Sequence, residues 1–163
     1  MADYLSFLPA HIRRCRTGEV RRQHGRGAGM TRGVETDSRQ WEGDAFCYLT
    51  TTGRVTGKPH EIEIWFALHA EDTTQLAMMA GGGLKSDWVR NLAKTPDVTI
   101  RISTIIYPAT ARIIAAGDPE EAWIRRALVE KYRRPDEPLT DWGRIALPIL
   151  FTLDPEAAHP AES

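Results

Sequence analysis

Short runs of β-branched and aromatic residues, each stopped by glycine, proline or a polar turn, dominate this 163-residue chain after about position 40. Such runs are typical of strands, and residues 60–64 also alternate polar and apolar, as a strand with one solvated face does. The predicted strands are 45–52, 60–68, 75–80, 98–103, 109–115 and a closing strand at 149–153. Residues 107 and 108 are expected to join the fourth strand to the fifth. The links between strands are short, so we expect mostly antiparallel pairing.

Two helices interrupt these strands. The first is predicted over 86–93, with Ser86 as its N-cap, Asp87 at its positive end and Trp88 on its buried face. The second is predicted to start at Asp118, which precedes a proline and a glutamate. Its apolar residues then recur on one face as far as Tyr132. The order β-β-β-α-β-β-α-β predicts an α+β fold, a mainly antiparallel small barrel with flanking helices.

Charge divides the chain at about residue 40. Residues 1–39 hold eight arginines and four acidic residues, a net +4 that leaves −5 for the rest. This head has no hydrophobic period after Ile12, so we predict a disordered basic extension over 1–40, one domain over 41–156 and a tail over 157–163. One hypothesis makes the head a basic arm that touches phosphate or an anionic membrane surface. The favoured one makes it a dispensable extension, since Met30 could initiate an intact domain.

Composition argues against several classes of protein. A net charge of −1 gives the molecule no field that would attract nucleic acid. No apolar run approaches the 18 or more residues of a membrane helix, and the basic head lacks the apolar stretch of a secretory signal. We therefore expect a cytoplasmic protein, peripheral to the membrane only if the head binds it. The histidines lack metal-ligand spacing, and the chain has no G-x-S-x-G nucleophile motif, so we expect neither a metal site nor a catalytic triad.

Two segments have the character of an anion-binding site. Gly81, Gly82 and Gly83 precede the first predicted helix, where backbone N–H groups and the helix dipole favour an anion, and Lys85 adds a charge. The loop between the first two strands presents Arg54 and Lys58. Together they predict a ligand that bears phosphate, although the spacing matches neither a Walker A nor a dinucleotide motif.

Two blocks of sequence then carry a family resemblance. Residues 49–59 read LTTTGRVTGKP, and residues 81–92 read GGGLKSDWVRNL, with IWF between them at 64–66 and Pro96 and Val98 after them. In this order, over about 45–155, they resemble the deazaflavin-dependent nitroreductase family. The resemblance implies a split β-barrel related to pyridoxamine-phosphate oxidases and binding of coenzyme F420, which carries a phosphodiester and an oligoglutamate tail. It also implies hydride transfer from the reduced deazaflavin to a small electron-poor acceptor such as a quinone, nitro or enone compound.

The resemblance also implies roles for individual residues. It places the phosphate and tail at Arg54, Thr56, Gly57 and Lys58. The remaining implied cofactor contacts are Ile64, Trp65, Met79, Ala80, Gly81, Gly82, Gly83, Lys85 and Trp88. Tyr132 matches a position in the acceptor pocket and is a candidate, with water, for protonating the product; Asn91 is expected to be structural.

The chain also departs from the family pattern. It reads Ala80-Gly81 where relatives carry Ser-Lys, and residues 133–138 replace a tyrosine-rich lid. Both changes bear on nitroimidazole reduction and leave the cofactor site largely intact. Two alternatives share the fold: a non-catalytic protein that binds a lipid or flavin, and an FMN-dependent oxidase. Either a monomer or a homodimer fits the sequence.

Overall fold

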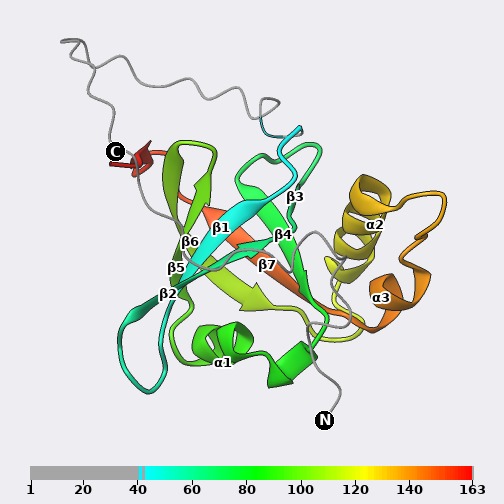
Figure 1. Cartoon of the computed structure of the whole chain (residues 1–163), viewed down its shortest axis with the longest axis horizontal. Coiled ribbons are helices and arrows are strands. Elements are labelled where there is room, and N and C mark those ends of the chain that lie inside the picture. Colours follow the sequence, from blue (N-terminus) through cyan, green and yellow to red (C-terminus); the bar gives the residue numbers. More distant parts are fainter. Residues whose placement is uncertain (1–40, 42, 163) are drawn as a thin grey trace.

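A computed structural model describes Trp41 and residues 43–162 (Figure 1). The predicted extension over 1–40 lies outside the described residues. The strands are β1 (Cys47–Thr52), β2 (Pro59–Ile64), β3 (Ala67–Leu68), β4 (Gln75–Ala80), β5 (Asp97–Ile102), β6 (Ile105–Ile113), β7 (Leu147–Leu153) and β8 (His159–Pro160). The helices are the short 3₁₀ helix η4 (Gly83–Lys85), α1 (Asp87–Lys94), α2 (Glu121–Tyr132) and α3 (Thr140–Ile145).

The strands form a single antiparallel sheet in the order β2-β1-β5-β6-β7-β4-β3, and β8 pairs with β6. The two edge strands, β2 and β3, are consecutive in the chain and only Trp65 and Phe66 separate them. Because two residues link the two edge strands, the sheet curls and its edges approach each other where β2 ends and β3 begins. This confirms the split β-barrel (Figure 1). In the described part of the chain, no helix is long and apolar enough to cross a membrane.

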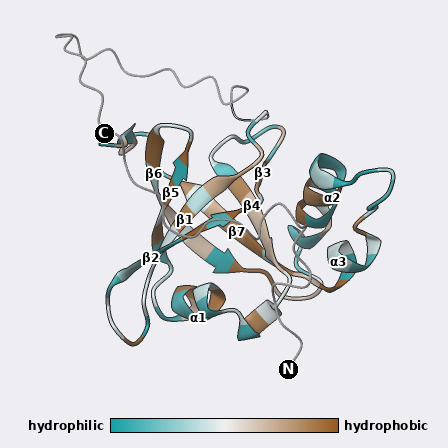
Figure 2. Ribbon diagram, in the orientation of Figure 1, coloured by the Kyte–Doolittle hydropathy of each residue, from teal (hydrophilic) through white to brown (hydrophobic). Residues whose placement is uncertain are grey.

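Strand β4 shows how the sheet separates two hydrophobic cores. Leu76, Met78 and Ala80 belong to the cluster inside the barrel, while Ala77 and Met79 belong to a cluster on the other face. Because side chains alternate along a strand, one strand serves both cores, and every residue of β4 after Gln75 is buried. Helices α2 and α3 lie over the outer cluster, and Figure 2 shows the hydrophobic residues gathered on the strands.

Several elements differ from their predicted form. The predicted strand 60–68 is two strands, because the chain leaves the sheet edge at Trp65 and Phe66. Strands β5 and β6 join through a tight turn at Ser103, whose φ is 52°, so Tyr107 and Pro108 lie within β6 and are not the connection.

The helix starts differ as well. Helix α2 begins at Glu121, with Glu120 and not Asp118 at the N-cap position. The Asp118 carboxylate instead accepts the N–H of Glu120 at 2.9 Å, in the turn before the helix. Ser86 is at the N-cap position of α1, but its hydroxyl makes no capping bond. Helix α3 and strand β8, which lies within the predicted tail, were not predicted.

Candidate functional site

The loop between β1 and β2 has an ordered backbone. The N–H of Gly53 donates to the carbonyl of Lys58 at 2.8 Å, and the N–H of Gly57 donates to the carbonyl of Gly53 at 2.8 Å. The N–H of Lys58 also donates to the Thr56 hydroxyl oxygen at 3.2 Å. Gly57 has a φ of +68°, a conformation that favours glycine. The predicted tail-binding residues thus project from a defined turn.

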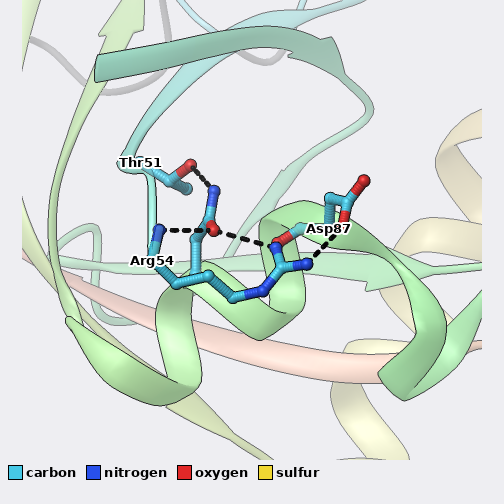
Figure 3. Close-up of polar contacts among 4 residues, drawn as sticks. Thr51, Arg54 and Asp87 are labelled. Atoms are coloured by element: carbon cyan, nitrogen blue, oxygen red, sulfur yellow. Dashed lines mark hydrogen bonds and ion pairs between the residues drawn. The ribbon is translucent and has the colours of Figure 1, made fainter. Parts of the chain in front are cut away.

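Contacts with α1 hold this loop in place (Figure 3). The Arg54 guanidinium donates to Asp87 at 2.9 Å and to the side-chain oxygen of Asn91 at 3.3 Å. That same Asn91 oxygen accepts the backbone N–H of Arg54 at 3.0 Å, and its amide nitrogen donates to Thr51 at 3.1 Å. Lys94 donates to the Arg54 carbonyl at 2.7 Å. Asn91 is therefore buried and structural, and it joins the end of β1, the loop and the helix.

A hollow of about 360 Å³ lies between this loop, β2 and α1. Its lining residues are Gly53, Arg54, Val55, Thr56, His60, Glu61, Ile62, Asp87, Trp88 and Asn91. Of the predicted contacts, Arg54, Thr56 and Trp88 line it. Lys58 and Lys85 are both exposed, and neither forms an ion pair with another described residue.

Two buried polar groups at the start of α1 have no hydrogen-bond partner among the described residues. They are the Ser86 hydroxyl and the Trp88 indole N–H, in residues that are 9% and 6% exposed. Leaving a buried donor unpaired costs about 1–3 kcal/mol, so a polar partner for these two groups would be stabilising. They lie where the glycine segment enters the helix. Donors and basic side chains of this kind suit a phosphate-bearing group.

The second group of predicted residues is aromatic and lies on the outer face of the sheet. Trp65 and Tyr132 stack with ring centroids 4.4 Å apart and planes inclined by 5°. Trp142 meets Trp65 edge to face, at 5.6 Å. A Cβ atom on Gly81 would lie 3.4 Å from the indole nitrogen of Trp142, so the glycine segment reaches this group. Helix α3 supplies Trp142, which was not predicted as a site residue because neither α3 nor a motif around it was recognised in the sequence.

Tyr132 is anchored through its hydroxyl. The oxygen accepts the backbone N–H of Phe66 at 3.0 Å, and it lies 2.9 Å from the carbonyl of Phe66 and 3.0 Å from that of Ala45. Burial raises the pKa of the Tyr132 phenol well above its usual value. The group therefore stays protonated and donates to one of those carbonyls.

Other predicted contacts are enclosed by protein. The side chains of Met79 and Ala80 are buried in the outer and inner cores, and that of Ile64 packs against the inner core. A contact between the cofactor and Met79 or Ala80 would therefore have to be made by the backbone, since both side chains are buried. Gly82 and Gly83 lead into η4, where Gly83 has a φ of +54°.

A second hollow, of about 560 Å³, contains none of the predicted site residues. It lies between β3 and α2 and is lined by Trp41, Phe66, Ala67, Leu68, His69, Ala70, Thr73, Ala127, Glu130 and Lys131. Among the described residues, no cluster of three or more His, Cys, Asp or Glu has the arrangement of a metal site. Cys47 is fully buried in the inner core, and burial raises the pKa of its thiol.

Comparison with known proteins identifies the family. A family model described as F420H(2)-dependent quinone reductase matches residues 20–141. A solved F420 reductase is similar at 21% identity, with a TM-score of 0.57 over 77% of this chain and 97% of that chain.

Two further solved structures share the fold. One is a putative pyridoxamine 5'-phosphate oxidase from Listeria innocua, 14% identical, with a TM-score of 0.54 over 77% of this chain and 93% of that chain. The other is a putative 5-nitroimidazole antibiotic resistance protein from Bacteroides thetaiotaomicron, 14% identical, with a TM-score of 0.56 over 83% of this chain and 92% of that one. A search of curated proteins finds no match. By its family match, the chain belongs to the F420H(2)-dependent quinone reductases, oxidoreductases that use the deazaflavin coenzyme F420.

Proposed function

We propose that this protein uses reduced F420 to reduce a quinone-type acceptor, with the anionic arm of the cofactor in the hollow between the β1–β2 loop and α1. The observation that carries the proposal is the Arg54 guanidinium, which lines that hollow and is fixed by Asp87 and Asn91. Lys58 on the same loop and Lys85 just before α1 support it as exposed cations without an ion pair among the described residues. The family match supports F420 as the cofactor.

The basic side chains divide into two kinds. Arg54 is already neutralised in part by Asp87, at 2.9 Å, and its position is fixed by Asn91. Lys58 and Lys85 have no such carboxylate among the described residues. We assign these two lysines to pair with the negative charges of the phosphodiester and the glutamate tail. Arg54 would instead donate hydrogen bonds from N–H groups held in a fixed direction.

The unpaired donors at the start of α1 explain why a phosphate would bind here rather than anywhere on the loop. The Ser86 hydroxyl and Trp88 N–H lie beside the positive end of the helix dipole. A small shift of the glycine segment that exposes them to a phosphate oxygen would relieve their desolvation.

We assign the aromatic residues Trp65, Tyr132 and Trp142 to the site of the planar deazaflavin ring and the acceptor. The cofactor, when bound, supplies a hydride to the acceptor. Trp65 would offer an apolar wall, and Tyr132, locked by its hydrogen bonds to Phe66, would hold Trp65 in orientation. Because the Tyr132 proton is committed to a backbone carbonyl, we assign the proton that completes reduction to water.

Turnover by the full chain tests this proposal. Purified protein is mixed with reduced F420 and 2-methyl-1,4-naphthoquinone, and reoxidation of the deazaflavin is followed by its absorbance. The proposal expects protein-dependent oxidation that saturates with quinone and is lost in the double variant Lys58→Ala, Lys85→Ala at low cofactor concentration. The reductase assignment would be contradicted if the protein binds F420 but reduced F420 is reoxidised no faster than in buffer, whichever of several quinones is added. That result would favour a non-catalytic binder.

A further inference from the structure

We propose that the indole N–H of Trp142 is a ligand-binding donor, which hydrogen bonds to a ring oxo group of the acceptor or of the deazaflavin beside Gly81. The inference rests on the proposed function and deepens it, because it identifies a contact on α3 that the family motifs do not include.

The indole N–H has no partner within the described protein. No described residue forms a hydrogen bond with it, although the side chain is half-buried against the outer core. Trp123, another half-buried tryptophan of the same core, instead donates its N–H to the carboxylate of Glu120. The indole nitrogen of Trp142 has no partner among the described residues and is not one of their buried unpaired atoms, so it reaches solvent. Of the two tryptophans, Trp142 therefore has the donor that a ligand could use.

The edge that carries this N–H is left uncovered by the absence of a side chain at Gly81. A Cβ atom there would lie 3.4 Å from the indole nitrogen and 3.6 Å from Cδ1. Gly81 belongs to the segment assigned to the cofactor, and Trp65, the proposed ring wall, touches Trp142 edge to face. The donor therefore lies where two predicted parts of the cofactor site, Gly81 and Trp65, meet.

Two contacts fix α3 and hence the direction of the N–H. Arg125 on α2 donates to the carbonyls of Gly143 and Ala146 at 2.8 and 2.9 Å, while Glu121 holds its guanidinium at 2.8 Å. Gly143 also lies so close to α2 that a Cβ atom there would overlap a methyl carbon of Val129. Because α3 is held in place, the Trp142 side chain would lose little conformational entropy when its N–H binds a ring oxo group.

Kinetics and binding of the full-length Trp142→Phe variant test the proposal, since phenylalanine keeps an aromatic ring and lacks the N–H. A neutral hydrogen bond corresponds to a roughly fivefold change in affinity. If the oxo group belongs to the acceptor, KM for 2-methyl-1,4-naphthoquinone rises about fivefold and Kd for F420 is unchanged. If it belongs to the deazaflavin, Kd for F420 rises by that factor instead. Trp123→Phe, the matched control, leaves both constants within twofold of wild type.

A second measurement works without turnover, so it separates this inference from the proposed function. In a ¹⁵N–¹H spectrum, the indole resonance assigned to Trp142 by its loss in Trp142→Phe should shift when F420 or the quinone is added, while that of Trp123 stays in place. Gly81→Ala, which covers the donor edge and keeps the tryptophan, should reduce this shift and raise the same constant that Trp142→Phe raises. The inference is overturned if Trp142→Phe leaves both constants unchanged and the Trp142 resonance does not respond to either ligand.

Discussion

The rings of Trp65 and Tyr132 are nearly parallel, 4.4 Å apart at their centroids, and join the end of β2 to the end of α2. The Tyr132 hydroxyl extends the contact to the backbone of Phe66, the residue after Trp65. Tyr132 thus holds in place the two residues, Trp65 and Phe66, that connect the edge strands β2 and β3.

Tyr132→Phe should separate this structural role from a chemical one. The change leaves the stack intact but removes the acceptor of the buried Phe66 N–H, so we expect the free energy of unfolding to fall by about 1–3 kcal/mol in a urea titration. The turnover number should remain within about twofold of wild type, because water supplies the proton. Tyr48→Phe, which removes the hydroxyl that donates to Glu63 at 2.8 Å on the same sheet, is the control. A loss of turnover at unchanged stability would show that the phenol takes part in the reaction.

Replacing Lys58 and Lys85 with alanine should weaken F420 binding by about tenfold, and by more for cofactors with longer glutamate tails. The loss should shrink as salt is added, because exposed charges are screened over roughly 10 Å at 0.1 M salt. Arg126→Ala removes an exposed charge from α2 and serves as the control. Equal affinities for long and short tails in the double variant would place the tail elsewhere.

Asp87→Asn should strengthen F420 binding. The carboxylate of Asp87 pairs with Arg54 at 2.9 Å, and it is largely exposed, so its removal leaves the guanidinium charge for the ligand at little cost to the fold. Isothermal titration at low salt should show a Kd lower by about two- to fivefold, the range expected for an exposed charge pair. A higher Kd would mean that Asp87 is needed to orient Arg54.

The start and identity of most strands could be predicted from the sequence, because alternation and breakers are local signals. Helix α3 could not, since its six residues include Gly143 and its stability comes from packing on α2 and from Arg125. Trp142 was missed with it. The loop residues Arg54 and Thr56 line a hollow beside α1, and their contact with the cofactor stays a prediction. The enclosure of Met79 between core residues depends on the pairing of β4 with β7, which no local pattern reveals.

Gly143→Ala should lower the free energy of unfolding by about 1–3 kcal/mol, as overpacking does, because the new methyl group would overlap Val129. Adding Val129→Ala should recover part of the loss by making room. Gly43→Ala is the control, since no atom of the described residues beyond its chain neighbours lies within 4 Å of a Cβ there. Additive effects of the two changes in chemical denaturation would mean that α3 does not pack on α2 at this point.

The acid side of the stability profile should depend on Asp118. The N–H of Glu120, and then Arg112, hold the pKa of this carboxyl below its ordinary value of 3.8. A lowered pKa in the folded state stabilises the protein above pH 3.8, and the contribution is lost as the pH falls through the folded-state value. Wild type should therefore exceed Asp118→Asn in stability at pH 7, and the two should converge in acid. A difference that persists unchanged at pH 2 would exclude this ionisation as its source.

The central claim, that the hollow beside the β1–β2 loop binds the deazaflavin cofactor, is tested most directly by titrating the full chain with F420 and with FMN while tryptophan fluorescence is followed. We predict saturable quenching by F420 at micromolar concentrations, weakened in the Lys58→Ala, Lys85→Ala double variant, with no comparable response to FMN. Tight binding of FMN without binding of F420 would contradict the claim and assign the protein to the flavin-dependent oxidases of the same fold.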